Sequence, residues 1–327
     1  MQRLCPMPLF FSDETNTIDT FSDSIKNWKP VNSIDEEKYY TFIADFGFNP
    51  SYSPHYNESL EQLSTHIKKM NKDSILFLGG DNFYDMSTPL KEQHENFKKM
   101  FNPRCEYYAV MGNHDYYIDP SQYIKETFFN MKNWYYTVEK DNCIFYMIDT
   151  CLVNPNTIDT GYQNIARSRN VTCNTIQACE CVCDALRGDM LEWLDKELQK
   201  NTDKINIVIG HYPIYTYGTY RHNNDIMMTH LFPILKKHNV KLYLSGHEHN
   251  TQHSIINDGD YSLNVIVSGA CVDVRTRFSL DKMSGENLVY ANEIDSLILK
   301  FKIDNNINCK FHKVDNNDVI YSFDIIL

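Results

Sequence analysis

Five apolar stretches of this chain each end in side chains that can bind a metal ion. The stretches lie at residues 42–44, 75–78, 108–111, 207–209 and 242–245. The polar residues that follow them are Asp45, Asp81, Asn113, His114, His211, His247 and His249. In α/β sheets the carboxyl ends of parallel strands open onto the crevice where ligands bind. The recurrence therefore predicts that these side chains, although far apart along the chain, converge at one site.

Strand-like runs alternate with helix-like segments along most of the chain. Runs rich in β-branched and aromatic residues occur at about 39–45, 74–79, 106–112, 134–149, 205–210, 240–246, 263–269, 296–303 and 319–327. Helical periodicity occurs at about 58–72, 91–101, 121–131, 187–200 and 226–238. This order predicts an α/β domain with largely parallel buried strands, outer helices and an antiparallel sheet edge in 263–327. We expect an irregular arm at 1–37, one domain at 38–327 and a long irregular insertion at 152–186.

The charge balance excludes some classes of binding partner. The 327 residues carry 31 Lys and Arg against 43 Asp and Glu, which gives a net charge of −12 with His neutral. Broad binding to nucleic acid or anionic lipid depends on Lys and Arg, so we expect neither partner. No apolar run approaches the roughly 18 residues of a membrane span. The first residues, broken by Pro6 and Pro8, show no legible secretory signal. We expect a soluble chain, and its compartment stays open.

Each candidate ligand has a common structural explanation when it stands alone. An Asp after a buried strand usually caps a helix or belongs to a turn, and a single His is usually a hydrogen-bonded structural residue. Five successive strand ends would need such explanations independently, so a shared metal site is the better interpretation. Carboxylate, imidazole, amide and phenol groups suit iron, zinc or manganese. Asp81, which follows Gly79 and Gly80, is the natural carboxylate to bridge two ions.

A cluster of four cysteines lies outside these strand ends. It consists of Cys173, Cys179, Cys181 and Cys183. The spacing lacks the Cys-x-x-Cys pattern of structural zinc sites, so we expect disulfides or free thiols there.

The five blocks resemble the metallophosphoesterase superfamily and, within it, the purple acid phosphatases of the small, tartrate-resistant type. The superfamily's first block is Asp-x-His, whereas this chain has Gly47 in the place of that His. Tyr84, three residues after Asp81, matches the ligand that purple acid phosphatases use instead. Glu248, between the last two histidines, replaces an Asp without removing a ligand. The likeness extends over about 38–327. The remaining blocks are Gly112-Asn113-His114-Asp115, Gly210-His211-Tyr212-Pro213 and Gly246-His247-Glu248-His249.

The resemblance implies a fold and a pair of metal ions. The fold would be a four-layer αββα sandwich with two mixed β-sheets, the calcineurin-like metallophosphoesterase fold, with 38–327 as its catalytic domain. The ligands of an Fe(III) ion would be Asp45, Tyr84, His249 and the bridging Asp81. The ligands of a divalent ion, Fe(II), Zn(II) or Mn(II), would be Asn113, His211, His247 and the same Asp81.

The resemblance also implies an activity. The chain would hydrolyse phosphomonoesters of small molecules or phosphoproteins by attack of a metal-bound hydroxide at acid pH, since Fe(III) acidifies water more strongly than Zn(II). His114 would donate a proton to the leaving oxygen, unless it only braces its loop through Asp115. His222 is a candidate for a second proton donor and Arg221 for a phosphate contact, but a solvated loop explains both as well. We expect a monomer, and relatives are often secreted or lysosomal.

Two other functions stay open. One is a phosphodiesterase or nucleotidase of the same superfamily, because a metal site alone does not fix the class of ester, although Tyr84 favours a monoesterase. The other is a non-catalytic, phosphatase-like anchor or virion protein, although such chains usually lose ligands and this one keeps all seven. Asp45-Phe46-Gly47 is also the magnesium-binding triplet of protein kinases. A kinase is excluded, because no His-Arg-Asp catalytic loop precedes the triplet.

Overall fold

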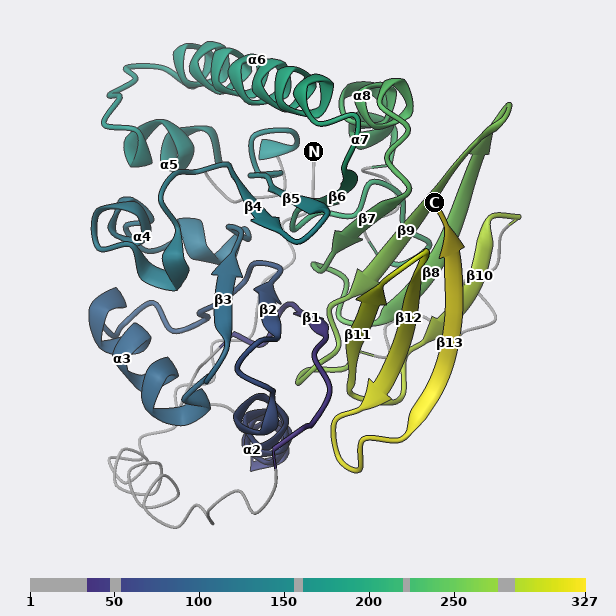
Figure 1. Cartoon of the computed structure of the whole chain (residues 1–327). Helices are drawn as coiled ribbons and strands as arrows, with labels where there is room; N and C mark the ends of the chain where they lie inside the picture. Colours follow the sequence, from purple (N-terminus) through teal and green to yellow (C-terminus); the bar gives the residue numbers. More distant parts are fainter. Residues whose placement is uncertain (1–33, 48–53, 156–160, 220–223, 276–285) are drawn as a thin grey trace.

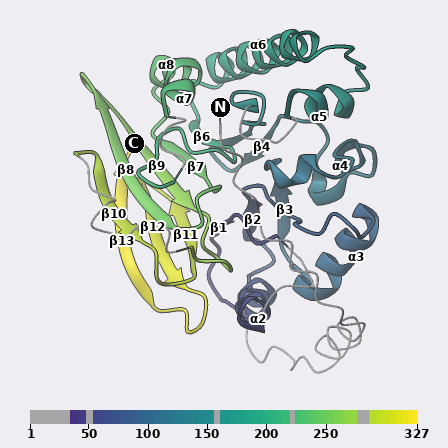
Figure 2. The same ribbon diagram turned by 180° about the vertical axis from the view of Figure 1, so that it is seen from behind.

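Two mixed β-sheets face each other in the computed structural model, and helices cover part of the outer side of each sheet (Figure 1). The structure describes residues 34–47, 54–155, 161–219, 224–275 and 286–327. The view from behind shows the same arrangement, with α2 and α3 beside β1 to β3 and with α6 to α8 at the end of β4 to β7 (Figure 2). The expected αββα sandwich is confirmed.

The first sheet has six strands in the order β13-β12-β11-β1-β2-β3. Its parallel half holds β1 (Tyr40–Ile43), β2 (Ile75–Leu78) and β3 (Glu106–Ala109). Its antiparallel half holds β11 (Leu297–Ile303), β12 (Asn306–Lys313) and β13 (Val319–Ile326). This half confirms the antiparallel edge that the sequence predicts for the last third of the chain.

The second sheet has seven strands in the order β10-β8-β9-β7-β6-β5-β4. Four adjacent strands run parallel to one another: β5 (Cys143–Met147), β6 (Ile205–Ile209), β7 (Leu242–Ser245) and β9 (Tyr261–Ser268). The other three strands each pair in antiparallel orientation: β4 (Tyr136–Lys140) with β5, β8 (Thr251–Asp258) with β9, and β10 (Leu288–Asn292) with β8. The carboxyl ends of β5, β6, β7 and β9 therefore lie at one edge of this sheet.

The helices pack on the outer faces of both sheets. They are α2 (Pro54–Lys69), α3 (Leu90–Phe101), α4 (Ser121–Lys125), α5 (Gly161–Ser168), α6 (Ile176–Lys200), α7 (Asn224–His230) and α8 (Phe232–Lys237). Phe97 of α3 lies 5.7 Å from Tyr107 of β3 between ring centroids, and Trp193 of α6 lies 6.4 Å from Tyr146 of β5. Two short 3₁₀ turns span His114–Tyr116 and Phe128–Asn130.

Alternation of side chains along the strands produces two apolar layers. Phe42 and Phe77 are paired in register and point into the space between the sheets, where Phe77 meets Phe145 of the second sheet. Their chain neighbours Ile43 and Leu76 point to the helices instead. Burying one such side chain stabilises a fold by about 1.5–3 kcal/mol, so both layers hold the strand ends in place.

The prediction of an irregular insertion at 152–186 is wrong, because this segment contains α5 and the first eleven residues of α6. Thr175 caps α6 by accepting a hydrogen bond from the N–H of Ala178 at 3.1 Å. The sequence also predicts a single run at 134–149, whereas the chain forms a hairpin of β4 and β5 that turns at Asp141, which has a φ of 54°. The predicted helix at 121–131 ends at Lys125, and the one at 226–238 is divided between α7 and α8.

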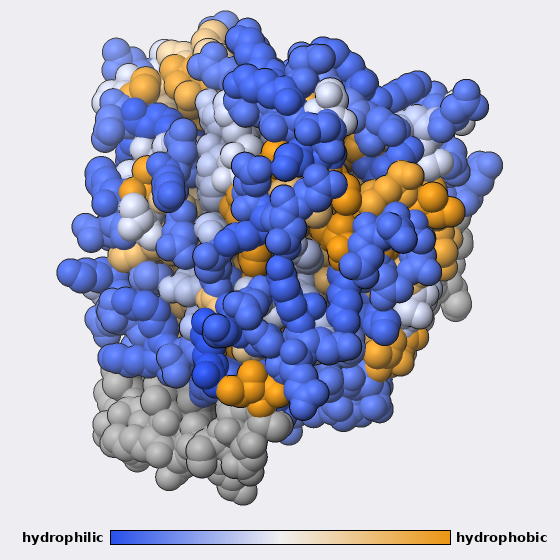
Figure 3. Space-filling view, in the orientation of Figure 1, coloured by the Kyte–Doolittle hydropathy of each residue, from blue (hydrophilic) through white to orange (hydrophobic). Residues whose placement is uncertain are grey.

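The surface is mostly hydrophilic on the face shown in Figure 3, with an apolar patch over the end of β13. Ile326 and Leu327 belong to the exposed large hydrophobic residues of this region. Within the described ranges, none of the helices combines the length and the apolar character that a bilayer crossing requires.

Candidate metal centre

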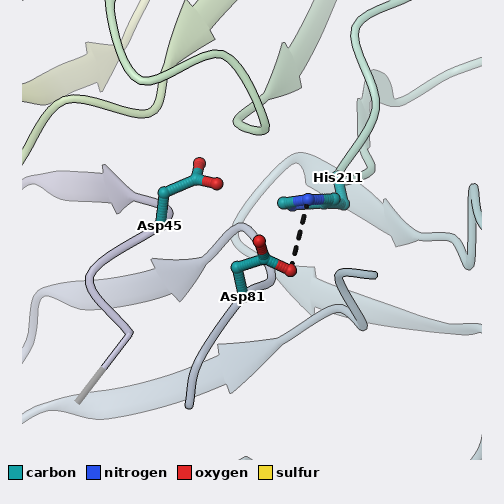
Figure 4. A group of neighbouring side chains, drawn as sticks. All are labelled: Asp45, Asp81 and His211. Atoms are coloured by element: carbon teal, nitrogen blue, oxygen red, sulfur yellow. Dashed lines mark ion pairs between the residues drawn. The ribbon is translucent and has the colours of Figure 1, made fainter. Parts of the chain in front are cut away.

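The polar residues predicted from the sequence follow strands of both sheets and meet at one point. Asp45 and Asp81 follow β1 and β2 of the first sheet, whereas His211 follows β6 of the second. One ligand atom from each of these three residues lies within 4.8 Å of the other two (Figure 4). All three side chains are at most 2% exposed. The two sheets thus bring together groups from opposite halves of the chain.

Asp81 lies at the centre of this group. Its Oδ1 is 3.4 Å from Nε2 of His211 and accepts the backbone N–H of His114 at 2.9 Å. Tight backbone packing allows this position: a Cβ at Gly112 would lie 2.2 Å from Oδ1 of Asp81. Gly80 has a φ of +90°, and a Cβ there would lie 2.7 Å from Nδ1 of His211. Both glycines are therefore required for the approach of the strand ends.

His211 presents a ring nitrogen to two oxygen atoms. Its Nδ1–H donates to the carbonyl of Gly79 at 2.9 Å, which leaves the lone pair on Nε2. That Nε2 lies 3.1 Å from Oδ1 of Asn113 and 3.4 Å from Oδ1 of Asp81. Three electron-rich atoms facing one another repel unless a cation lies among them. This geometry fits a metal site.

A second group of candidate ligands surrounds Asp45. Its Oδ2 accepts the backbone N–H of His247 at 2.7 Å, whereas its buried Oδ1 accepts no hydrogen bond from any described residue. Nε2 of His249 lies 3.9 Å from that Oδ1 and 3.3 Å from the Tyr84 hydroxyl. The other ring nitrogen of His249 lies 3.2 Å from Oδ2 of Asp273. A carboxylate behind a histidine is the usual arrangement that orients a metal-binding imidazole.

Tyr84 occupies the space that a side chain at residue 47 would fill. A Cβ built on Gly47 would lie 2.0 Å from Cδ2 of Tyr84. The absence of a side chain at Gly47 and the presence of Tyr84 are therefore two parts of one steric arrangement. The Tyr84 ring is also 4.6 Å from that of His114 between centroids.

Burial disfavours charge throughout this cluster. Burial and the nearby Asp81 carboxylate raise the pKa of Asp45, and burial with both carboxylates raises the pKa of Tyr84. Burial lowers the pKa of His211, His247 and His249. The imidazoles are therefore neutral, as metal binding requires, and a cation would compensate for the buried carboxylates.

Residues other than the predicted ligands also support the site. Oγ1 of Thr150 accepts the backbone N–H groups of His211 at 3.0 Å and Tyr212 at 2.9 Å. Glu248 accepts the Thr216 hydroxyl at 3.1 Å and so holds the segment that follows β6. Asp273 lies beyond β9, after Gly269. The rule that a polar residue follows a strand and a glycine could have found Asp273.

Other predicted residues lie at the edge of the cluster or outside it. The His114 side chain is 40% exposed, with Nε2 at 3.9 Å from Oδ2 of Asp81. His222 and Arg221 fall outside the described residues. In the cysteine cluster, Cys179 and Cys183 are buried and Cys181 is exposed. The nine cysteines within the described residues are free thiols.

Comparisons of sequence agree with this geometry. Residues 38–251 match the profile of the calcineurin-like phosphoesterase family. Tartrate-resistant acid phosphatase type 5 of Sus scrofa is 27% identical over 249 residues, which cover 70% of this chain and 68% of that protein. Purple acid phosphatase 17 of Arabidopsis thaliana is 27% identical over 244 residues, which cover 70% and 66%. The chain thus spans about two thirds of the length of these relatives.

Solved structures share the fold. The structure titled GAP50, the anchor in the inner membrane complex of Plasmodium, superposes with a TM-score of 0.66 at 19% identity, covering 89% of both chains. Purple acid phosphatase PPD1 from yellow lupin (Lupinus luteus) seeds superposes with a TM-score of 0.63 at 14% identity, covering 91% of this chain and 55% of that one.

Proposed function

Since the chain belongs to the calcineurin-like phosphoesterase family, we propose that it is an acid phosphatase that hydrolyses phosphomonoesters with two metal ions. The observation that carries this proposal is that the Tyr84 ring occupies the space that a side chain at Gly47 would fill. A tyrosine ligand in that place is the mark of the purple acid phosphatases, which the sequence resembles. The substrates would be phosphorylated small molecules or phosphoproteins.

The residues divide into two sets of candidate ligands. Asp45, Tyr84 and His249 would hold Fe(III), which prefers anionic oxygen donors. Asn113, His211 and His247 would hold a divalent ion, Fe(II), Zn(II) or Mn(II). Asp81, which lies between the sets, would serve both. When bound, such a pair supplies positive charge that polarises the phosphate and acidifies a water nucleophile.

His114 is proposed as the proton donor to the leaving oxygen. Its backbone N–H is fixed by Asp81, while its ring is partly exposed beside Tyr84. Asp115 accepts the N–H of Gly112 at 2.8 Å and the hydroxyl of Tyr123 at 2.7 Å, so Asp115 itself braces the loop. The His114 ring is therefore available to the substrate side. His222 stays a candidate for a second donor.

The test of this proposal combines metal analysis, a visible spectrum and turnover. We expect protein supplied with iron and zinc to bind two ions per chain, to absorb visible light through the phenolate and to hydrolyse an aryl phosphate at acid pH. Tyr84→Phe should abolish the visible band, because the phenolate oxygen is removed. Tyr56→Phe is the matched control: Tyr56 hydrogen-bonds the carbonyls of Phe46 and Gly47 and should leave the colour unchanged. A Tyr84→Phe protein that keeps its band would contradict the ligand assignment.

A non-catalytic anchor is the second candidate, because a structure that shares the fold along most of its length is titled as an anchor. That function predicts a protein that takes up no metal and hydrolyses no aryl phosphate even when iron and zinc are supplied. A phosphodiesterase or nucleotidase would instead bind both metals and prefer diesters or nucleotides over aryl phosphate. The same preparation therefore separates all three functions.

A further inference from the structure

Arg275 lies beside the candidate metal centre but is not one of its ligands. It follows β9, and its backbone N–H donates to the carbonyl of His249 at 2.9 Å. The side chain is about one third exposed, so it borders both the buried cluster and solvent. Burial lowers the pKa of His249, and the charge of Arg275 lowers it further. Burial and the two carboxylates raise the pKa of Tyr84, and the charge of Arg275 opposes that rise. The guanidinium is thus close enough to act on the centre electrostatically.

One carboxylate fixes the direction of this guanidinium. Nε of Arg275 donates to Oδ2 of Asp273 at 2.7 Å, and the same oxygen lies 3.2 Å from Nδ1 of His249. Against the effect of burial, these two partners lower the pKa of Asp273 to about 2, so the carboxylate is ionised. Only Nε is used in this way: within the described residues the terminal nitrogens of Arg275 make no hydrogen bond. They remain available for an anion.

A cavity of about 650 Å³ opens at this guanidinium. Its volume is typical of sites for small molecules. Tyr56, Val272, Glu58 and Asp315 line it together with Arg275 and Asp273. Lys313, the second cation among the described residues that line the cavity, is paired with Asp295 at 2.7 Å. Among the described residues that line the cavity, Arg275 is therefore the cation whose terminal nitrogens can still bind an anion.

We propose that Arg275 binds the phosphate group of the substrate with its terminal N–H groups. A guanidinium held at Nε presents two parallel donors, which match two oxygens of a phosphate. The inference rests on the proposed function, because that function puts a phosphate next to His249 and Tyr84. It goes beyond that function by naming a protein cation that holds the phosphate together with the metal ions.

Phosphate affinity is the direct test. Protein loaded with iron and zinc is titrated with inorganic phosphate by calorimetry, and KM and kcat for an aryl phosphate are measured in parallel. We expect Arg275→Gln to weaken phosphate binding and to raise KM by about 10-fold or more, with metal content and absorption maximum unchanged. Arg275→Lys should bind phosphate more tightly than Arg275→Gln but less tightly than the wild type, because it keeps the charge and lacks the two parallel N–H donors. Lys313→Gln, the matched control in the same cavity, should bind phosphate as the wild type does.

Two results would overturn the inference. One is a phosphate affinity for Arg275→Gln within twofold of the wild type. The other is a lower metal content or a shifted absorption band with KM unchanged, which would mean that Arg275 acts only through Asp273 and His249. If the variants do not fold, wild-type protein is treated with phenylglyoxal, and mass spectrometry reports whether phosphate protects Arg275. Equal modification with and without phosphate contradicts the proposal.

The two proposals fail in different ways. A wild-type protein that binds phosphate through Arg275 but hydrolyses no aryl phosphate would refute the phosphatase and keep the Arg275 site. An active wild type whose phosphate affinity does not depend on Arg275 would refute only the site.

Discussion

At the scale of single residues, three candidate ligands hold an unusual backbone. Asp45, Asp81 and His247 have φ values of 56°, 53° and 70°. A left-handed backbone costs about 1–2 kcal/mol for a residue with a Cβ, and such strain gathers at functional sites. The strain here turns each side chain from its strand end into the centre of the cluster.

Replacement of Asp81 is expected to remove both ions. We predict that Asp81→Ala lowers bound metal to less than one ion per chain and reduces turnover by more than about 100-fold, because both ligand sets share this carboxylate. Elemental analysis and aryl phosphate hydrolysis check this. Asp81→Asn should lose metal as well, although Asn tolerates the left-handed backbone. Asp85→Asn is the control, since Asp85 caps the same loop through Ser87.

The candidate ligands could be predicted from the sequence, because each lies within six residues of the end of a strand. Asp273 fits the same rule, because it follows β9 and Gly269, but the roles of Asp273 and Arg275 could not be predicted. Their roles depend on contacts with His249 over 20 residues away, and no local pattern records such contacts.

At the scale of elements, the strand ends depend on buried hydrogen bonds that cross between strands. Thr150, after β5, accepts two backbone N–H groups at the end of β6. These bonds fix the direction in which His211 leaves its strand. The positions of strands were predictable from apolar runs, whereas this connection between neighbouring strand ends was not.

Substitution of Thr150 tests this connection. We predict that Thr150→Val, which keeps the shape and removes the acceptor, destabilises the fold by about 2 kcal/mol, since two buried N–H groups lose their partner. Urea unfolding measures the loss, and metal titration should show weaker binding. Thr65→Val removes only an exposed hydrogen bond to the Glu61 carbonyl and should change neither the free energy of unfolding nor the metal affinity. Equal stability of Thr150→Val and the wild type would contradict the role.

The helix α6 shows where element prediction failed. Its first turns contain Cys179 and Cys183, which the spacing suggested as part of an irregular, cysteine-rich loop. The structure buries both on one face of the helix, one turn apart, and the cap at Thr175 begins the helix early. Burial of cysteine as a small apolar residue explains the pattern better than its chemistry does.

At the scale of the whole molecule, the αββα order follows from the alternation of strands and helices, and it was predictable. The pairing of strands was not: β1 lies between β2 and β11, which are far apart in sequence. Such long-range pairing depends on which faces bury each other, and contacts such as the stacking of Tyr40 of β1 on Phe301 of β11 form only in three dimensions.

Buried histidines predict an acid limit for the fold. Burial lowers the pKa of His66, His94 and His253 to about 4 each. The unfolded chain binds protons at these residues near pH 6.5, before the folded chain does, so stability is present above that pH and is lost as pH falls towards 4. We predict a melting temperature that is steady above pH 7 and falls between pH 6.5 and 4.

His94 offers the sharpest test of this acid limit. Its ring lies 4.3 Å from that of Phe128 between centroids, and neither ring nitrogen makes a hydrogen bond within the described residues. Between pH 7 and pH 5, His94→Phe should lose about 1 kcal/mol less folding stability than the wild type, a figure that allows for solvent screening. Thermal melts at pH 7 and pH 5 measure the difference. An unchanged pH dependence would show that His94 does not contribute.

The candidate ligands are divided between the two sheets, with Asp45 and Asp81 on one and His211 and His247 on the other. Bound ions would therefore cross-link the halves of the sandwich and add their binding free energy to that of folding. Heat tolerance would follow the metal supply, so the same polypeptide made under iron shortage would unfold earlier and be degraded sooner.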